Sequence, residues 1–393
     1  MNQTQVPPVQ AETLAMIERL IGFDTTSRDS NLGLIEYARD YLQGFGIVSR
    51  LTYDASGKKA NLFATVQKGG KPGIVLSGHT DVVPVDGQNW ASDPFKATVK
   101  GDRLYGRGAC DMKSYLAVIL TMAPRFAAAN LNAPIHFALS YDEEVGCIGA
   151  RGLLEDLARN DIRPAGAIIG EPTSMQPVIA HKGKRSYQCC VRGKEAHSAL
   201  TPQGVNAIEY AARIISYIRH MAERMQACEP RDYGFDVPFT TLQTGVISGG
   251  TASNIVPREC NFQFEFRYLP GADPDALERE IKDYAERVIL PEMHRTDPGT
   301  SISIETNSAN PGLSTSEKDE ITRLAQALSR NPTTGKVAYL TEGGLFQQAG
   351  IPAIVCGPGS IEQAHKPDEF VTLEQVALCE SFMERLLEQM CAG

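Results

Sequence analysis

The strongest constraint on the fold is a series of four short apolar runs, each followed by acidic or histidine side chains. The runs lie at residues 74–76, 135–139, 167–169 and 353–355. Runs of this length, with helical patterns such as 112–126 between them, are typical of buried strands in an α/β domain. In such domains, functional sites gather where the strands reach their carboxyl ends. We therefore expect the polar side chains after the runs to converge on one edge of a sheet.

The pattern of apolar residues changes in the middle of the chain. A chain of 393 residues is longer than a single domain usually is, so two domains are expected. A long helical pattern at 206–222 is followed by strict polar–apolar alternation at 261–267. Such alternation fits an open antiparallel sheet with helices on one side. The simplest organisation is an α/β domain, with a mixed sheet flanked by helices, made of 1–183 and 299–393 and interrupted by an α+β domain at 184–298.

Composition and charge argue against several classes of protein. The net charge is −9 without a basic stripe, which disfavours nucleic acid as the main partner. No run approaches the roughly 18 apolar residues of a membrane span, and the first residues lack the pattern of a secretory signal. The nine cysteines are scattered and never spaced as C-x-x-C, which indicates reduced thiols. We expect a cytoplasmic protein without a membrane or nucleic-acid partner.

Residues that follow the apolar runs, together with Asp111 before the helical pattern at 112–126, form a candidate set for a metal site. The set comprises His79, Asp81, Asp111, Glu143, Glu144, Glu171 and His365. Imidazole and carboxylate groups without a cysteine suit a pair of divalent ions such as Zn²⁺, Co²⁺ or Mn²⁺. So much negative charge at one edge would be costly unless cations neutralised it. Taken singly, His79 also fits an ordinary turn histidine, and Asp111 fits a helix cap.

The adjacent acids Glu143 and Glu144 indicate a division of labour. Neighbouring residues cannot easily serve the same purpose, so one can hold a metal while the other stays free to take a proton from a water molecule, as a hydrolase requires. Two solvated acids in a loop are the alternative interpretation. The apolar strand directly before the pair favours the functional one.

Five ordered motifs resemble those of the M20 family of co-catalytic zinc aminoacylases and carboxypeptidases. The motifs are SGHTDVVP, LYGRGACDMK, DEEVG, GEPT and QAHKPDE. The ligands that this resemblance implies are His79 and Glu171 for one zinc ion, Glu144 and His365 for the other, and Asp111 as the bridge. It further implies Glu143 as general base, Asp81 as the carboxylate that orients His79, and a cis peptide bond after Asp111. Where the family usually has glycine after DMK, this chain has Ser114.

The same resemblance implies roles for the inserted domain, which would be a lid and the surface of a homodimer. His197 would cross from one subunit to stabilise the oxyanion in the site of the other. Asn254 and Arg267 would contact substrate, and a guanidinium suits a free α-carboxylate. Without the resemblance, His197 reads as a surface turn histidine and Arg267 as an exposed strand arginine.

Within the family, the stretches 168–188 and 357–371 most resemble members that hydrolyse N2-acetyl-L-ornithine to acetate and L-ornithine, a step of arginine synthesis. The implied cofactors are two divalent ions, Zn²⁺ with Co²⁺ as a substitute. Three alternatives stay open: desuccinylation of N-succinyl-diaminopimelate, another acyl-amino-acid or peptide hydrolysis, and a non-catalytic binding protein on the same scaffold. The expected partner is in each enzymatic case a small N-acyl amino acid.

Overall fold

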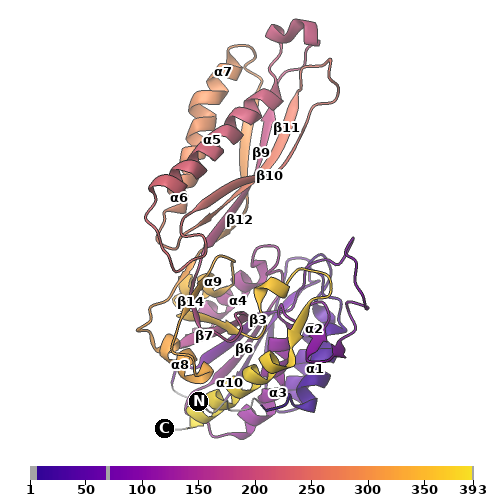
Figure 1. The fold of residues 1–393 in the computed structure, drawn as a ribbon, viewed down its shortest axis with the longest axis vertical. Helices are drawn as coiled ribbons and strands as arrows, with labels where there is room; N and C mark the ends of the chain where they lie inside the picture. Colours follow the sequence, from indigo (N-terminus) through magenta and orange to yellow (C-terminus); the bar gives the residue numbers. More distant parts are fainter. Residues whose placement is uncertain (1–6, 68–70, 392–393) are drawn as a thin grey trace. The chain divides into compact units, whose positions relative to one another are not determined.

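The computed structural model describes residues 7–67 and 71–391 and divides the chain into two compact units (Figure 1). Unit 1 comprises the described residues of Met1–Ala180, Leu313–Lys336 and Thr341–Gly393. Unit 2 comprises His181–Gly312 and Val337–Leu340. Unit 2 is thus inserted in the chain of unit 1.

Unit 1 is built on a mixed sheet. Its strands, in spatial order, are β1 (Ser49–Tyr53), β2 (Ala60–Val66), β6 (Ile135–Ser140), β3 (Ile74–His79), β7 (Gly166–Pro172), β15 (Ala353–Gly357), β8 (Val178–His181) and β13 (Leu313–Ser314), with β14 (Gly335–Val337) paired to β8. The central strands β6, β3, β7 and β15 run parallel, and β1, β2 and β8 are antiparallel to their neighbours. The four predicted apolar runs are these parallel strands, and each is buried along its whole length.

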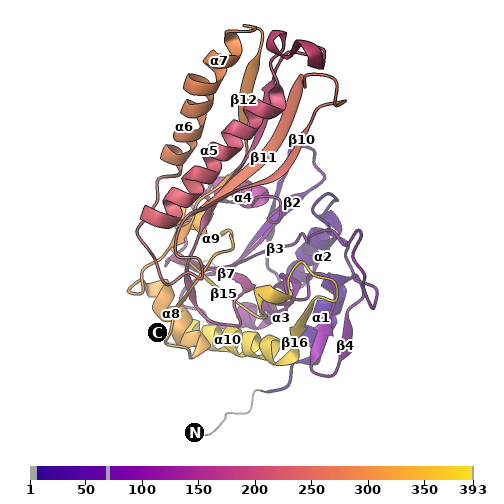
Figure 2. The ribbon, with the colours of Figure 1, turned by 45° about the horizontal axis from the view of Figure 1, so that its top comes forward.

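Helices cover both faces of this sheet (Figure 2). They are α1 (Ala11–Ile21), α2 (Leu32–Gln43), α3 (Lys113–Ala128), α4 (Ile148–Arg159), α8 (Glu320–Ser329), α9 (Gly343–Gln348) and α10 (Leu373–Cys391). The connections β3–α3–β6 and β6–α4–β7 step along the sheet in opposite directions, so right-handed crossovers place α3 and α4 on opposite faces. The predicted α/β fold, with helices flanking a mixed sheet, is confirmed.

A small second sheet in unit 1 joins two distant segments. Its strands are β16 (Phe370–Thr372), β5 (Arg103–Tyr105) and β4 (Thr98–Lys100). The antiparallel register pairs Phe370 with Tyr105 and Thr372 with Arg103. This pairing brings the end of the QAHKPDE motif beside the loop that leads to Asp111.

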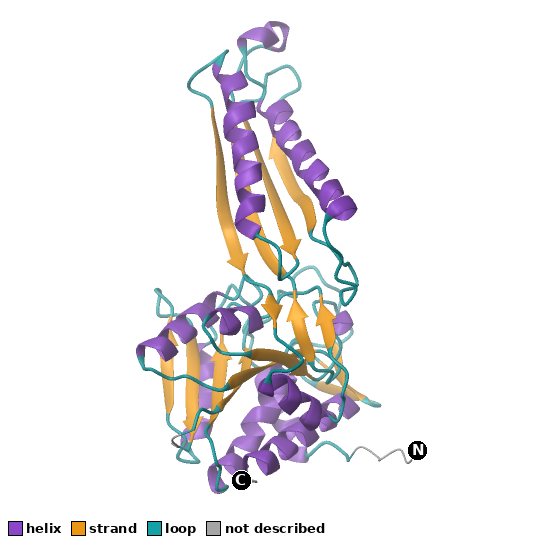
Figure 3. Ribbon diagram, turned by 90° about the vertical axis from the view of Figure 1, so that its left-hand side faces the viewer, coloured by secondary structure: helices purple, strands orange, loops and turns teal. Residues whose placement is uncertain are grey.

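Unit 2 is an antiparallel sheet with helices on one face (Figure 3). The strand order is β10 (Thr241–Gly249), β11 (Glu259–Tyr268), β9 (Gly183–Arg192) and β12 (Ser301–Asn310). The helical segments are η1 (Ser198–Gln203), α5 (Ala207–Cys228), α6 (Pro274–Tyr284), η2 (Ala285–Ile289) and α7 (Leu290–His294). Phe262, Phe264 and Phe266 on alternate positions of β11 are buried in its core, as the alternation predicts.

The bounds of unit 2 differ from those expected for the inserted domain at 184–298, because unit 2 begins at His181 and also includes Val337–Leu340. We expected the inserted domain to end at residue 298, but unit 2 continues to Gly312. The reason is β12, which pairs with β9 from Ser301 to Asn310 and so completes the sheet of unit 2. Ile302 and Ile304 of β12 pack against the core of unit 2.

Within the described ranges, the helices all lack the length or the apolarity that crossing a bilayer requires. The remaining short helix, η3 (Ile361–Gln363), lies between β15 and the turn that carries His365.

Candidate metal centre

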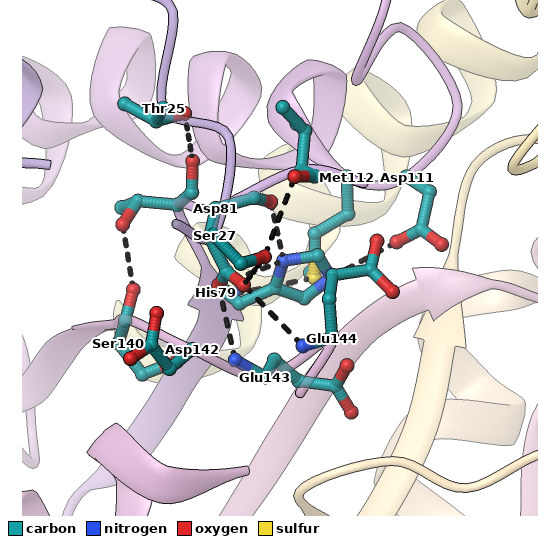
Figure 4. Close-up of polar contacts among 12 residues, drawn as sticks. Thr25, Ser27, His79, Asp81, Asp111, Met112, Ser140, Asp142, Glu143 and Glu144 are labelled. Atoms are coloured by element: carbon teal, nitrogen blue, oxygen red, sulfur yellow. Dashed lines mark hydrogen bonds and ion pairs between the residues drawn. The ribbon is translucent and has the colours of Figure 1, made fainter. Parts of the chain in front are cut away.

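Unit 1 brings the five predicted metal ligands together. His79 is the last residue of β3, and Glu171 lies in β7. Glu144 follows β6, Asp111 precedes α3, and His365 follows η3. The side chains of His79, Asp111 and Glu144 converge, as Figure 4 shows, and their ligand atoms lie within 4.8 Å of one another. The expected convergence at the carboxyl ends of the strands is therefore present in the structure.

The contacts among these five side chains form two halves that share Asp111. In the first, His79 Nε2 lies 2.9 Å from Asp111 Oδ1 and 3.6 Å from Glu171 Oε1. In the second, His365 Nε2 lies 3.1 Å from Glu144 Oε2 and 3.3 Å from Asp111 Oδ2. The imidazole of His79 is 1% exposed and that of His365 is 51% exposed. We call the pair His79 and Glu171 the buried half, and the pair Glu144 and His365 the open half.

His79 is oriented by the residue that the sequence suggested, but through its backbone. His79 Nδ1 donates to the carbonyl oxygen of Asp81 at 2.9 Å, whereas the Asp81 carboxylate lies 3.6 Å from the same nitrogen. This bond leaves Nε2 to face the carboxylates of Asp111 and Glu171, which is the arrangement of a metal-binding imidazole. The part that the Asp81 carboxylate itself plays in catalysis stays a prediction.

The carboxylate of Asp81 holds the turn that carries the two adjacent glutamates. It accepts hydrogen bonds from the backbone N–H groups of Glu143 at 3.0 Å and Glu144 at 3.3 Å. The hydroxyl of Ser27 donates to it at 2.7 Å. One buried acid therefore links the end of β3 to the turn after β6.

Glu143 is buried beside His79 and Glu171, and burial raises the pKa of its carboxyl to about 8. The thiol of Cys147 donates to its Oε1 at 3.2 Å. Its carboxylate also lies close enough to His79 and Glu171 to join them around one ion, because the three ligand atoms are within 4.8 Å. The role of Glu143 as base rather than ligand therefore stays a prediction that needs a direct test.

The charges of the site suit divalent cations. Burial raises the pKa of Glu171 and of Glu144 above the ordinary value for glutamate. Hydrogen bonds to Asp111 and Glu144 raise the pKa of His365 to about 10. Burial opposes ionisation of Asp111, yet the hydrogen bonds of His365 and His79 lower its pKa. Carboxylate oxygens and imidazole nitrogens are the donors that zinc, cobalt and manganese accept, so these residues fit a metal pair.

Comparison with known proteins assigns the family. The model of peptidase family M20/M25/M40 matches residues 75–389. The chain belongs to this family. An acetylornithine deacetylase of Myxococcus xanthus is 37% identical over 387 residues, which cover 96% of this chain and 97% of the relative. An acetylornithine deacetylase of Pasteurella multocida is 32% identical over 388 residues, which cover 97% and 98%.

Solved structures of M20 proteins share the fold. Aminopeptidase PepT from Bacillus cereus superposes with a TM-score of 0.74 at 21% identity, covering 98% of this chain and 99% of that one. An M20 family metallo-carboxypeptidase from Sulfolobus solfataricus gives 0.76 at 19% identity, covering 96% and 99%. At such identities the likeness concerns the fold alone. The predicted family and fold of this M20 chain are confirmed.

Two features near Asp111 bear on the sequence motifs of the M20 chain. The peptide bond between Asp111 and Met112 is cis, as the resemblance implied. Ser114, which replaces the usual glycine, is buried and donates its hydroxyl to the carbonyl oxygen of Ala109 at 2.5 Å. The serine is thus accommodated inside the first turn of α3 by a backbone acceptor.

Sequence reasoning missed one buried acid, Glu369, and one buried serine, Ser27. Glu369 accepts a hydrogen bond from the backbone of the Asp111 loop. Its position at the end of the QAHKPDE motif was the only feature of the sequence that could have pointed to it. Ser27 and its bond to Asp81 had no signal. Glu342 is a further buried acid, and it accepts hydrogen bonds from the hydroxyls of Ser77 and Ser140.

The three predicted residues of unit 2 lie in two loops and one strand. His197 and Asn254 are exposed and sit in adjoining segments, because the backbone N–H of Ser198 donates to the carbonyl oxygen of Asn254 at 3.0 Å. A surface hollow of about 560 Å³ adjoins these segments. Arg267 lies in β11, is one-third exposed and pairs with Glu265 at 3.3 Å. The roles assigned to these three side chains stay predictions.

Proposed function

We propose that this M20 chain is a metal-dependent amidohydrolase that converts N2-acetyl-L-ornithine to acetate and L-ornithine. The observation that carries the proposal is the convergence of His79, Asp111, Glu144, Glu171 and His365 in unit 1, with the carboxylate of Glu143 beside them. The choice of substrate is supported by the two acetylornithine deacetylases that match nearly the whole chain at 37% and 32% identity. This reaction would serve arginine synthesis.

The buried half would hold one ion and the open half the other, with Asp111 as the bridge between them. Zn²⁺ is the proposed metal, and Co²⁺ would replace it. When bound, such ions lower the pKa of water and polarise a carbonyl group. The chain itself supplies the fixed ligands and the surrounding hydrogen bonds that hold them.

Glu143 would move the proton during hydrolysis. Its carboxylate takes a proton from the attacking water as the new C–O bond forms at the acetyl carbon. The same carboxyl then gives that proton to the ornithine nitrogen as the C–N bond breaks. In the metal-free protein, burial raises the pKa of this carboxyl to about 8, which makes the carboxylate a stronger base for the first transfer.

Unit 2 would bind substrate and form a homodimer. His197 from a partner subunit would donate a hydrogen bond to the oxyanion. Asn254 would contact the substrate, and Arg267 would bind its α-carboxylate in place of Glu265, its present partner at 3.3 Å. The cytoplasmic location predicted from the sequence belongs to the same proposal.

A substrate panel tests the proposal. The zinc-loaded protein would be assayed for kcat/KM on N-acetyl-ornithine, N-succinyl-diaminopimelate and N-acetyl-methionine. We expect N-acetyl-ornithine to be preferred by about a hundredfold, equivalent to about 2.7 kcal/mol of transition-state binding. A preference for the succinyl substrate would instead assign a desuccinylase. No turnover of any of the three, with both ions bound, would contradict the hydrolase itself.

A further inference from the structure

A buried carboxylate, Glu369, binds the backbone of the loop that carries Asp111. Its side chain is 1% exposed. Its Oε1 accepts hydrogen bonds from the backbone N–H groups of Cys110 at 2.8 Å and Asp111 at 3.0 Å. Its Oε2 accepts from the N–H of Gly108 at 3.1 Å and from Nη1 of Arg107 at 2.7 Å. Four donors on one carboxylate fix the backbone directly before the shared ligand.

The guanidinium of Arg107 extends this contact to the turn that carries His365. Arg107 Nη2 donates to Gln88 Oε1 at 2.6 Å, and Gln88 Nε2 donates to the carbonyl oxygen of His365 at 3.1 Å. Arg107 Nη1 also lies 3.4 Å from the carbonyl oxygen of Lys366. We call Gln88, Arg107 and Glu369 the Glu369 network. It connects the Asp111 loop to the His365 turn without using any metal-binding atom.

The His365 turn needs such support because its backbone is strained. His365 has φ = 64° and Asp368 has φ = 55°, a left-handed conformation that residues other than glycine seldom adopt. The imidazole of His365 is also half exposed, so packing does not fix it. Strained backbone of this kind persists only where its surroundings determine it.

We propose that the Glu369 network sets the position of His365 relative to Asp111 and thereby the affinity of the open half for its ion. Its members are positioning residues, since each acts through the backbone of a ligand segment. A buried ion pair such as Arg107–Glu369 adds little to stability by itself, whereas hydrogen bonds around metal ligands commonly control metal affinity. The inference rests on the proposed function only in taking the site to bind two divalent ions.

The test removes the link to His365 while keeping both members of the buried ion pair, Arg107 and Glu369. Gln88→Leu deletes that link at a half-buried residue, so the protein is expected to fold. Gln326→Leu is the matched control, because Gln326 in α8 is also half-buried and donates to a backbone carbonyl, that of Pro332, at 2.7 Å. The full-length metal-free proteins would be titrated with Co²⁺ by calorimetry, alongside thermal unfolding of the metal-free forms.

We expect Gln88→Leu to weaken binding of one of the two ions by about tenfold to a hundredfold, the usual effect of removing an outer hydrogen bond, and Gln326→Leu to leave both unchanged. His365→Ala should affect the same ion, and adding Gln88→Leu to it should cause no further loss. Glu369→Gln, which keeps the side-chain size, should weaken the same ion more strongly.

Two results would overturn the inference. One is wild-type affinity for both ions in Gln88→Leu and in a folded Glu369→Gln protein. The other is a full additional loss when Gln88→Leu is combined with His365→Ala. These outcomes are separate from the proposed function, which fails if the wild-type protein binds two ions but leaves N-acetyl-ornithine intact.

Discussion

The two halves of the candidate metal centre are held by different parts of the fold. The buried half stands on neighbouring parallel strands, since His79 ends β3 and Glu171 lies in β7, and the two strands pair directly. The open half stands on turns. Glu144 lies in the turn after β6, and His365 lies in a turn with left-handed backbone.

The difference shows how a sheet and a turn each fix a ligand. In the buried half, strand register and burial place the side chains, and one backbone bond from His79 to Asp81 completes the orientation. In the open half, two hydrogen bonds hold the turns. The backbone N–H of Glu144 donates to the Asp81 carboxylate, and Gln88 Nε2 donates to the carbonyl oxygen of His365. The position of a candidate ligand on a strand therefore depends on packing of the core. The position of one in a turn depends on a few individual hydrogen bonds.

The largest expected effect concerns Glu143, which lies against the buried half. Glu143→Gln should lower kcat by about a hundredfold to ten-thousandfold, the usual contribution of a general base, while both ions stay bound. Glu144→Gln is the adjacent control and should lose the ion of the open half. Activity and metal content by mass spectrometry would be measured on the same samples. An ion lost from Glu143→Gln would make Glu143 a ligand of the buried half, beside His79 and Glu171.

The same difference explains how much the sequence could predict. Apolar runs that end in His79 and Glu171 mark strand ends, so the buried half follows from strand periodicity and the geometry of parallel sheets. Glu144 and His365 were also candidates because they follow apolar runs, but a turn leaves no periodic pattern that would show where it places the side chain. The Glu369 network and Ser27 act through contacts between residues far apart in the chain, which no local pattern records. The boundary at Gly312 was missed for a related reason, since only pairing with β9 assigns β12 to unit 2.

A smaller effect should separate the two histidines in the metal-free protein. His79→Ala removes a buried partner of Asp111 and Glu171, and we expect a loss of about 1–3 kcal/mol in the free energy of unfolding. His365→Ala removes a half-exposed partner of Glu144 and Asp111, and we expect a loss below about 1 kcal/mol. Urea unfolding at pH 7 would measure both. Equal losses would show that burial does not distinguish the halves.

The smallest expected effect is a difference in pH dependence. The pKa of Glu143 rises from 4.5 to about 8 through burial, so between these values the folded protein binds more protons than the unfolded chain. The stability that Glu143 contributes to the metal-free protein therefore falls as pH rises from about 5 to 8. The pKa of His365 rises from 6.5 to about 10 through hydrogen bonds to Asp111 and Glu144. Its contribution is complete below pH 6.5 and is lost as pH rises towards 10.

The two pH windows can be separated by variants. Glu143→Gln should flatten the fall between about pH 5 and 8, and His365→Ala should flatten only the part above about pH 7. The second change should be the smaller, because solvent screens the half-exposed imidazole of His365. Urea midpoints of the metal-free proteins at intervals from pH 5 to 10 would measure both slopes. If the Glu143→Gln protein kept the wild-type slope below pH 8, the Glu143 carboxyl would be hydrated in solution. Burial would then not distinguish the surroundings of the buried half from those of the open half.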